Sequence, residues 1–77
     1  MSLELKVTTS IAGFGEQSET SIVGPVADRA DALRIWQERH ELAFGGYDNV
    51  GDVTVSTEIV RCDEYPQLNG TSRESKT

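Results

Sequence analysis

Alternation of apolar and polar residues is the strongest pattern in the chain, and it predicts two β-strands. The first run covers residues 3–11, and the second begins at Val53 and ends near Cys62. A period of two places successive side chains on opposite faces of a sheet, so each run is typical of a strand with one buried face. The positions predicted to face the core are Leu3, Leu5, Val7, Thr9 and Ile11 in the first run and Val53, Val55, Thr57 and Ile59 in the second.

A further strand is predicted between these two runs, over residues 17–24. Gly13, Phe14 and Gly15 interrupt the first pattern, and glycine readily adopts the positive φ angles that tight turns need. The short connection favours an antiparallel hairpin. Pro25 has no amide hydrogen to donate to a neighbouring strand, so it marks the end of the second strand.

Residues 28–44 are predicted to form a helix. Asp28 is a good N-cap residue, and Asp31 places a negative charge in the first turn, where the helix dipole favours it. At 100° per residue one broad face carries the apolar side chains Ala32, Leu33, Ile35, Trp36, Ala43 and Phe44, and the opposite face carries Arg34, Glu38 and Glu41.

These elements predict a small α+β domain of the order ββαβ. We expect an antiparallel hairpin and one helix that packs on one face of a three-stranded sheet, with the direction of the third strand, parallel or antiparallel, left open. Residues 1–65 form this single domain. Residues 66–77 are polar apart from one leucine and are predicted to be a flexible C-terminal tail, because they bury too little apolar area to offset the entropy lost on ordering.

The chain is acidic, and this limits the partners that we expect. Its 77 residues carry a formal net charge of -6 at pH 7. Phosphate backbones and anionic membranes repel such a surface, so direct binding to nucleic acid or to a membrane is not expected. A single cysteine and the lack of a signal-peptide pattern favour the cytoplasm of a bacterium or of an infected host cell.

No residue pattern predicts a catalytic, metal or cofactor site. His40, the only histidine, is the one candidate general base, yet a boundary histidine packed beside Trp36 explains it better. Cys62 has the parity of the outward-facing residues of its strand and is expected to be an inert, partly covered thiol. One His and one Cys are too few for a zinc site within one chain, so no enzyme, metal or cofactor is expected.

The remaining hypothesis is a surface for protein binding. The outward strand faces are rich in Ser and Thr and poor in the lysines and prolines that block edge pairing. The candidate interaction residues are Thr8, Ser10, Glu38, Glu41, Thr54, Ser56 and Glu58.

We therefore expect a non-catalytic protein that binds and modulates another protein. The acidic charge of the chain would suit a basic partner. Small acidic proteins of this kind are typical of phages and mobile elements. Homodimerisation through strand edges is also expected. Two alternatives stay open: an acidic inhibitor that imitates nucleic acid in the groove of a host enzyme, and a small enzyme that uses His40.

Overall fold

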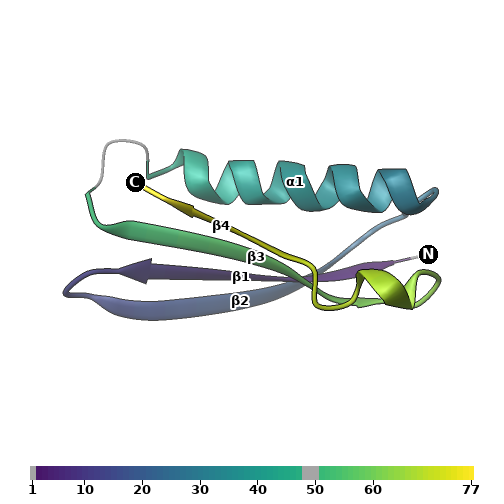
Figure 1. Cartoon of the computed structure of the whole chain (residues 1–77), viewed down its shortest axis with the longest axis horizontal. Helices are drawn as coiled ribbons and strands as arrows, with labels where there is room; N and C mark the ends of the chain where they lie inside the picture. Colours follow the sequence, from purple (N-terminus) through teal and green to yellow (C-terminus); the bar gives the residue numbers. More distant parts are fainter. Residues whose placement is uncertain (1, 48–50) are drawn as a thin grey trace.

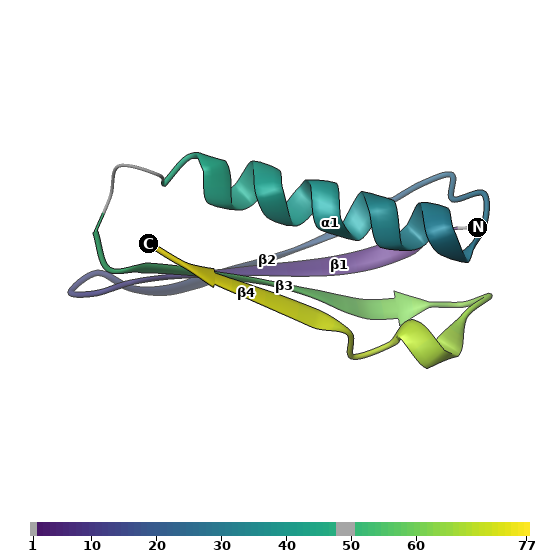
Figure 2. The same cartoon turned by 45° about the horizontal axis from the view of Figure 1, so that its top comes forward.

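The computed structural model describes residues 2–47 and 51–77, which form one antiparallel four-stranded sheet with a helix on one face (Figure 1). The strand order is β2-β1-β3-β4. Figure 2 shows that the helix α1 runs along the length of the sheet. In chain order the elements are β1 (Leu3–Ile11), β2 (Gly15–Val23), α1 (Arg29–Gly45), β3 (Val53–Cys62), the short 3-10 helix η1 (Pro66–Leu68) and β4 (Ser72–Lys76).

The α+β class and the local patterns that predicted it are confirmed. The helix begins after Asp28, whose Oδ1 accepts a hydrogen bond from the Asp31 backbone N at 2.8 Å. The Asp31 side chain also accepts a hydrogen bond, from the Ala27 backbone N to its Oδ2 at 2.9 Å. This exchange satisfies the Asp31 donor, which the first turn of the helix would otherwise leave unpaired, and the Ala27 donor just before the N-cap. Within the described residues no helix has both the length and the apolar character needed to cross a membrane.

The prediction of a three-stranded ββαβ sheet is wrong, because residues 66–77 contribute η1 and a fourth strand. β4 pairs with β3 in antiparallel register from Thr54 opposite Lys76 to Glu58 opposite Ser72. All pairings are antiparallel. The sequence Ser-Arg-Glu-Ser-Lys has no apolar face, so a strand held by hydrogen bonds leaves no hydrophobic pattern to detect.

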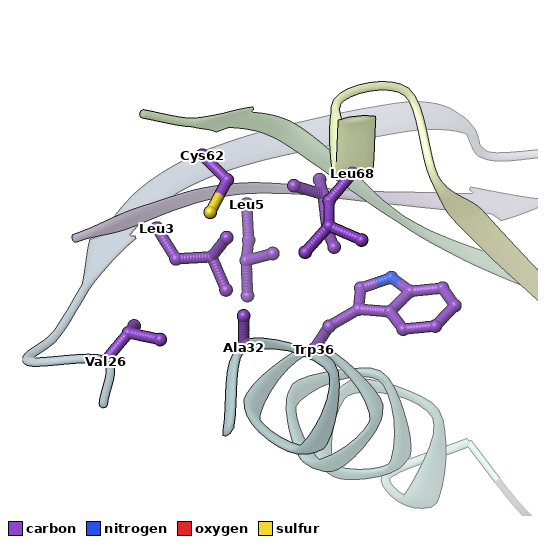
Figure 3. Close-up of a cluster of buried hydrophobic side chains, with 8 residues drawn as sticks. Leu3, Leu5, Val26, Ala32, Trp36, Cys62 and Leu68 are labelled. Carbon is purple, nitrogen blue, oxygen red and sulfur yellow. The ribbon is translucent and has the colours of Figure 1, made fainter. Parts of the chain in front are cut away.

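The core lies between α1 and the helix-facing side of β1 and β3, as Figure 3 shows. Its buried residues are Leu3, Leu5, Val26, Ala32, Trp36, Ile59, Cys62 and Leu68. Trp36 occupies the middle of α1, and its indole Nε1 donates a hydrogen bond to the Thr57 carbonyl oxygen at 2.9 Å. The ring therefore buries apolar area while its one polar atom is paired.

Cys62 is fully buried, which corrects the outward position predicted from strand parity. The register between β1 and β3 shifts by one residue. Leu5 lies opposite Ile59 and Glu4 opposite Arg61, so Val60 is an extra residue on β3. A β-bulge of this kind reverses the alternation beyond it, and this reversal turns the Cys62 side chain toward the core.

We predict that Trp36→Ala lowers the free energy of unfolding by about 3–5 kcal/mol, because it removes the largest core side chain and its hydrogen bond. Chemical denaturation followed by circular dichroism measures the loss. Trp36→Phe is the matched control: it keeps an aromatic ring and should cost distinctly less. Equal losses for the two variants would contradict the position assigned to the indole.

A second prediction concerns Leu68, the one apolar residue of the segment expected to be a tail. Leu68 is 4% exposed, so Leu68→Ala should lower the free energy of unfolding by about 2–5 kcal/mol. Its neighbour Gln67 is exposed, and Gln67→Ala should change the value by no more than about 0.5 kcal/mol. A Leu68→Ala protein as stable as the Gln67→Ala protein would show that η1 is detached in solution, as a flexible tail would be.

Candidate functional site

Five of the seven candidate interaction residues lie together on the sheet face that α1 does not cover. Thr8 pairs with Ser56 and Ser10 with Thr54 across β1 and β3, and Glu58 lies opposite Lys6 in the next pair of this face. Paired residues of an antiparallel ladder project from the same face. All five are partly exposed, and the Thr8 and Ser18 hydroxyls are hydrogen-bonded at 3.1 Å. The result is a continuous hydroxyl-rich surface, here called the outer face.

The other two candidates, Glu38 and Glu41, lie on α1 and therefore on the opposite side of the sheet. Glu38 forms an exposed ion pair with Arg34, with 2.9 Å between the Glu38 Oε1 and the Arg34 Nη1. Pairs of this type contribute little stability. The seven residues thus do not form one site, because the helix separates the two glutamates from the strand residues.

A groove that the sequence did not predict runs along the flank of α1 on the β2 side. Its first part, about 320 Å³, is lined by Leu5 and Val7 from β1, Glu19 and Ser21 from β2, and Arg39, Leu42 and Ala43 from α1. A second hollow shares Arg39 and Leu42 and continues to Val23, Pro25 and Ile35. Leu42 is 74% exposed. A large apolar residue outside the buried face was the one signal in the sequence that pointed to this groove.

The outer edge of β2 adjoins the groove. In the part of the chain that the structure describes, β2 pairs with β1 alone, and its residues from Gly15 to Ile22 are exposed on both faces. Glu16 and Glu19 take part in none of the ion pairs among the described residues. The strand contains neither Lys nor Pro. Its backbone donors and acceptors on this side are therefore available to another strand.

His40 is buried at 2% exposure in the same stripe of α1 as Ala32 and Trp36, and not at the edge of the apolar face as predicted. Its Nδ1 is 2.9 Å from the Thr57 Oγ1, and its Nε2 is 2.8 Å from the Ser75 Oγ. The imidazole also stacks on the Phe44 ring, with a centroid distance of 6.4 Å. The network joins α1 to β3 and β4.

Hydrogen bonds link the Ser75 hydroxyl to the His40 ring and the ring to the Thr57 hydroxyl. This arrangement resembles the one in which a histidine activates a serine nucleophile. The environment does not favour that chemistry. The grooves along α1 are lined by other residues, and the imidazole is almost inaccessible to a substrate. Burial, and then the positive charge of Arg73, lower the pKa of His40, while Glu41 acts in the opposite sense. His40 is thus held neutral within a structural network.

Metal binding would need a cluster of His, Cys, Asp or Glu side chains. Among residues 2–47 and 51–77, no three His, Cys, Asp or Glu side chains come close enough together to hold a metal ion. Cys62 lies at 0% exposure within the core. The chain matches no protein-family model, no curated protein and no solved structure.

The lowered pKa of His40 predicts how stability depends on pH. The unfolded chain binds a proton near pH 6.5, whereas the folded protein resists protonation at His40 until a lower pH. The free energy of unfolding should therefore rise with pH through this interval and level off above about pH 6.5. His40→Gln, which cannot titrate, should remove this rise. Denaturation at several pH values between 5 and 8 measures both proteins, and an equal slope in the two would refute the assignment.

Proposed function

We propose that this chain is a non-catalytic interaction protein that binds an extended, basic segment of another protein along the free edge of β2. The observation that carries the proposal is the nine-residue edge strand, exposed on both faces from Gly15 to Ile22 and paired on one side only within the described chain. A strand added there would form backbone hydrogen bonds along its length, which is a common mode of peptide recognition.

Charge favours a basic partner. β2 carries Glu16 and Glu19 without a described ion pair and no positive residue, and the whole chain has a net charge of -6. An acidic surface steers basic segments toward it and repels acidic ones. Specificity would come from side chains that enter the groove between β2 and α1, where Leu42 offers apolar contact.

A second copy of this chain is the alternative partner at the same edge, through pairing of β2 with its own copy. In an antiparallel pair with Thr20 opposite its own copy, Glu19 lies opposite Ser21 and Gln17 opposite Val23. This register avoids direct contact between glutamates and is compatible with a symmetric dimer. The net charge opposes such a dimer at low salt, so it should tighten as salt rises, whereas a complex with a basic partner should loosen.

The burial of His40 supports a binding role over an enzymatic one, because a general base must reach the proton that it removes. The alternative of an acidic inhibitor that imitates nucleic acid predicts binding through charge alone. It differs from strand addition in that an added positive charge should weaken binding by a similar amount at either sheet edge.

We predict that Thr20→Lys weakens partner binding at least tenfold, because it places a bulky positive charge in the middle of the β2 edge. Ser72→Lys is a closely matched control. Ser72 is an exposed hydroxyl residue on β4, and Thr20 and Ser72 end the same cross-strand row, through Lys6 and Glu58. The wild type and both variants are used to capture proteins from cells of the source organism, and the affinity of each captured protein is then measured at several salt concentrations.

The outcomes separate the hypotheses. Loss of binding with Thr20→Lys and retention with Ser72→Lys supports strand addition at β2. A complex that both variants weaken equally, and that dissociates steeply with salt, supports the nucleic-acid-mimicking inhibitor instead. Sedimentation of the isolated protein at low and high salt tests self-pairing: association that tightens with salt and disappears only in Thr20→Lys would show that a second copy occupies the edge.

A further inference from the structure

The strand β4 is attached to the molecule without any apolar side chain of its own. Its residues Ser72–Lys76 are exposed except for the partly buried Ser75. Its ties are the backbone ladder with β3, the bonds that join Thr77 to Val53, and the hydrogen bond between the Ser75 hydroxyl and the His40 ring. Segments with few buried apolar contacts open at low free-energy cost. β4 is therefore the element whose attachment a single side chain can control.

His40 is the side chain from α1 that contacts β4 by a hydrogen bond. Its Nε2 is hydrogen-bonded to the Ser75 Oγ on β4, and its Nδ1 is hydrogen-bonded to the Thr57 Oγ1 on β3. β4 therefore covers the Nε2 side of the imidazole. Departure of β4 would open the Nε2 side of the ring to water.

The charged groups that face His40 make the arrangement sensitive to a proton. Among the described residues, β4 contributes Arg73 and α1 contributes Glu41, whereas β3 contributes only the uncharged Thr57. Neither ring nitrogen is bonded to a carboxylate. An imidazolium would still donate to both hydroxyls. It would, however, be kept from water and repelled by Arg73, and both costs disappear when β4 leaves.

We propose that His40 is a pH-sensitive attachment point for β4: protonation of the imidazole releases the C-terminal strand and exposes the edge of β3. The detached state binds the proton better, because its imidazole is hydrated and Arg73 has moved away with the strand. A proton then shifts the population toward this state by its differential affinity for the two conformations. The newly exposed edge is Thr54–Glu58 of β3. This inference depends on α1, β3 and β4 and is independent of the function proposed for β2.

Hydrogen exchange measured by NMR tests the proposal on the intact chain. Protection factors, which correct each amide for its intrinsic exchange rate, are compared at pH 7.5 and 5.5. Two reporter amides are those of Thr77, which donates to the Val53 carbonyl, and Ile59, which donates to the Thr71 carbonyl. We expect their protection to fall several-fold at the lower pH and to stay below that of amides in the middle of α1 and β1 at both pH values, because those amides exchange only when the whole molecule unfolds.

Two variants isolate the imidazole as the cause. His40→Gln offers Ser75 an uncharged partner and should make the reporter protection independent of pH. Arg73→Gln removes the repulsion but keeps the titrating ring, so it should reduce the pH effect without abolishing it. Equal wild-type protection at the two pH values would overturn the proposal. So would a pH effect that persists in His40→Gln, or reporter amides with the same protection as the core amides at both pH values, because β4 would then leave only when the whole molecule unfolds. If His40→Gln fails to fold, an unreduced pH effect in Arg73→Gln overturns it.

Discussion

Two hydrogen bonds to one residue of the central strand, Thr57, determine how the helix lies on the sheet. The Trp36 indole donates to the Thr57 carbonyl oxygen, and the His40 ring bonds to the Thr57 hydroxyl one helical turn later. The surrounding core contacts are apolar and non-directional. These two bonds do have a direction, and leaving either buried polar group unpaired would be costly. They therefore hold one stripe of α1, from Ala32 to His40, over β3.

A helix held in this way contacts mainly β3 and β1 and leaves both edges of the sheet available. A helix is about 10 Å wide, and strands lie about 4.8 Å apart, so one helix covers about two strands. The helix therefore leaves the edge strands β2 and β4 uncovered. Both strands contain few apolar residues, so their exposure to water costs little free energy. The result is a thin core and two sheet edges of different character. The β2 edge is long and free, whereas β4 is short and is tied to the helix through His40.

This difference between the edges gives a physical basis for an interaction protein. Backbone pairing at β2 needs no rearrangement, because the strand is already formed and its outer side is unpaired in the described chain. The β3 edge, in contrast, becomes available only when β4 separates from it. A domain whose β2 edge is always free, and whose β3 edge is exposed only when β4 is released, would bind through the β2 edge in all conditions and through the β3 edge in acid. Under these two proposals, the buried polar network would regulate binding as well as specify the fold.

The sequence by itself determined β1, α1 and β3 and the α+β class, because each of these elements buries one face and so repeats apolar residues with the period of its own geometry. It also located the N-cap at Asp28 and the cluster of Ser and Thr on the outer face. Only the tertiary structure decided the rest. β4 has no hydrophobic period because backbone bonds to β3 hold it. Cys62 entered the core because a bulge at Val60 reversed the strand's alternation. His40 became buried because Thr57 and Ser75, 17 and 35 residues away in the chain, supplied partners for both of its nitrogens. Local spacing does not encode pairings at that distance, and these pairings place the candidate sites.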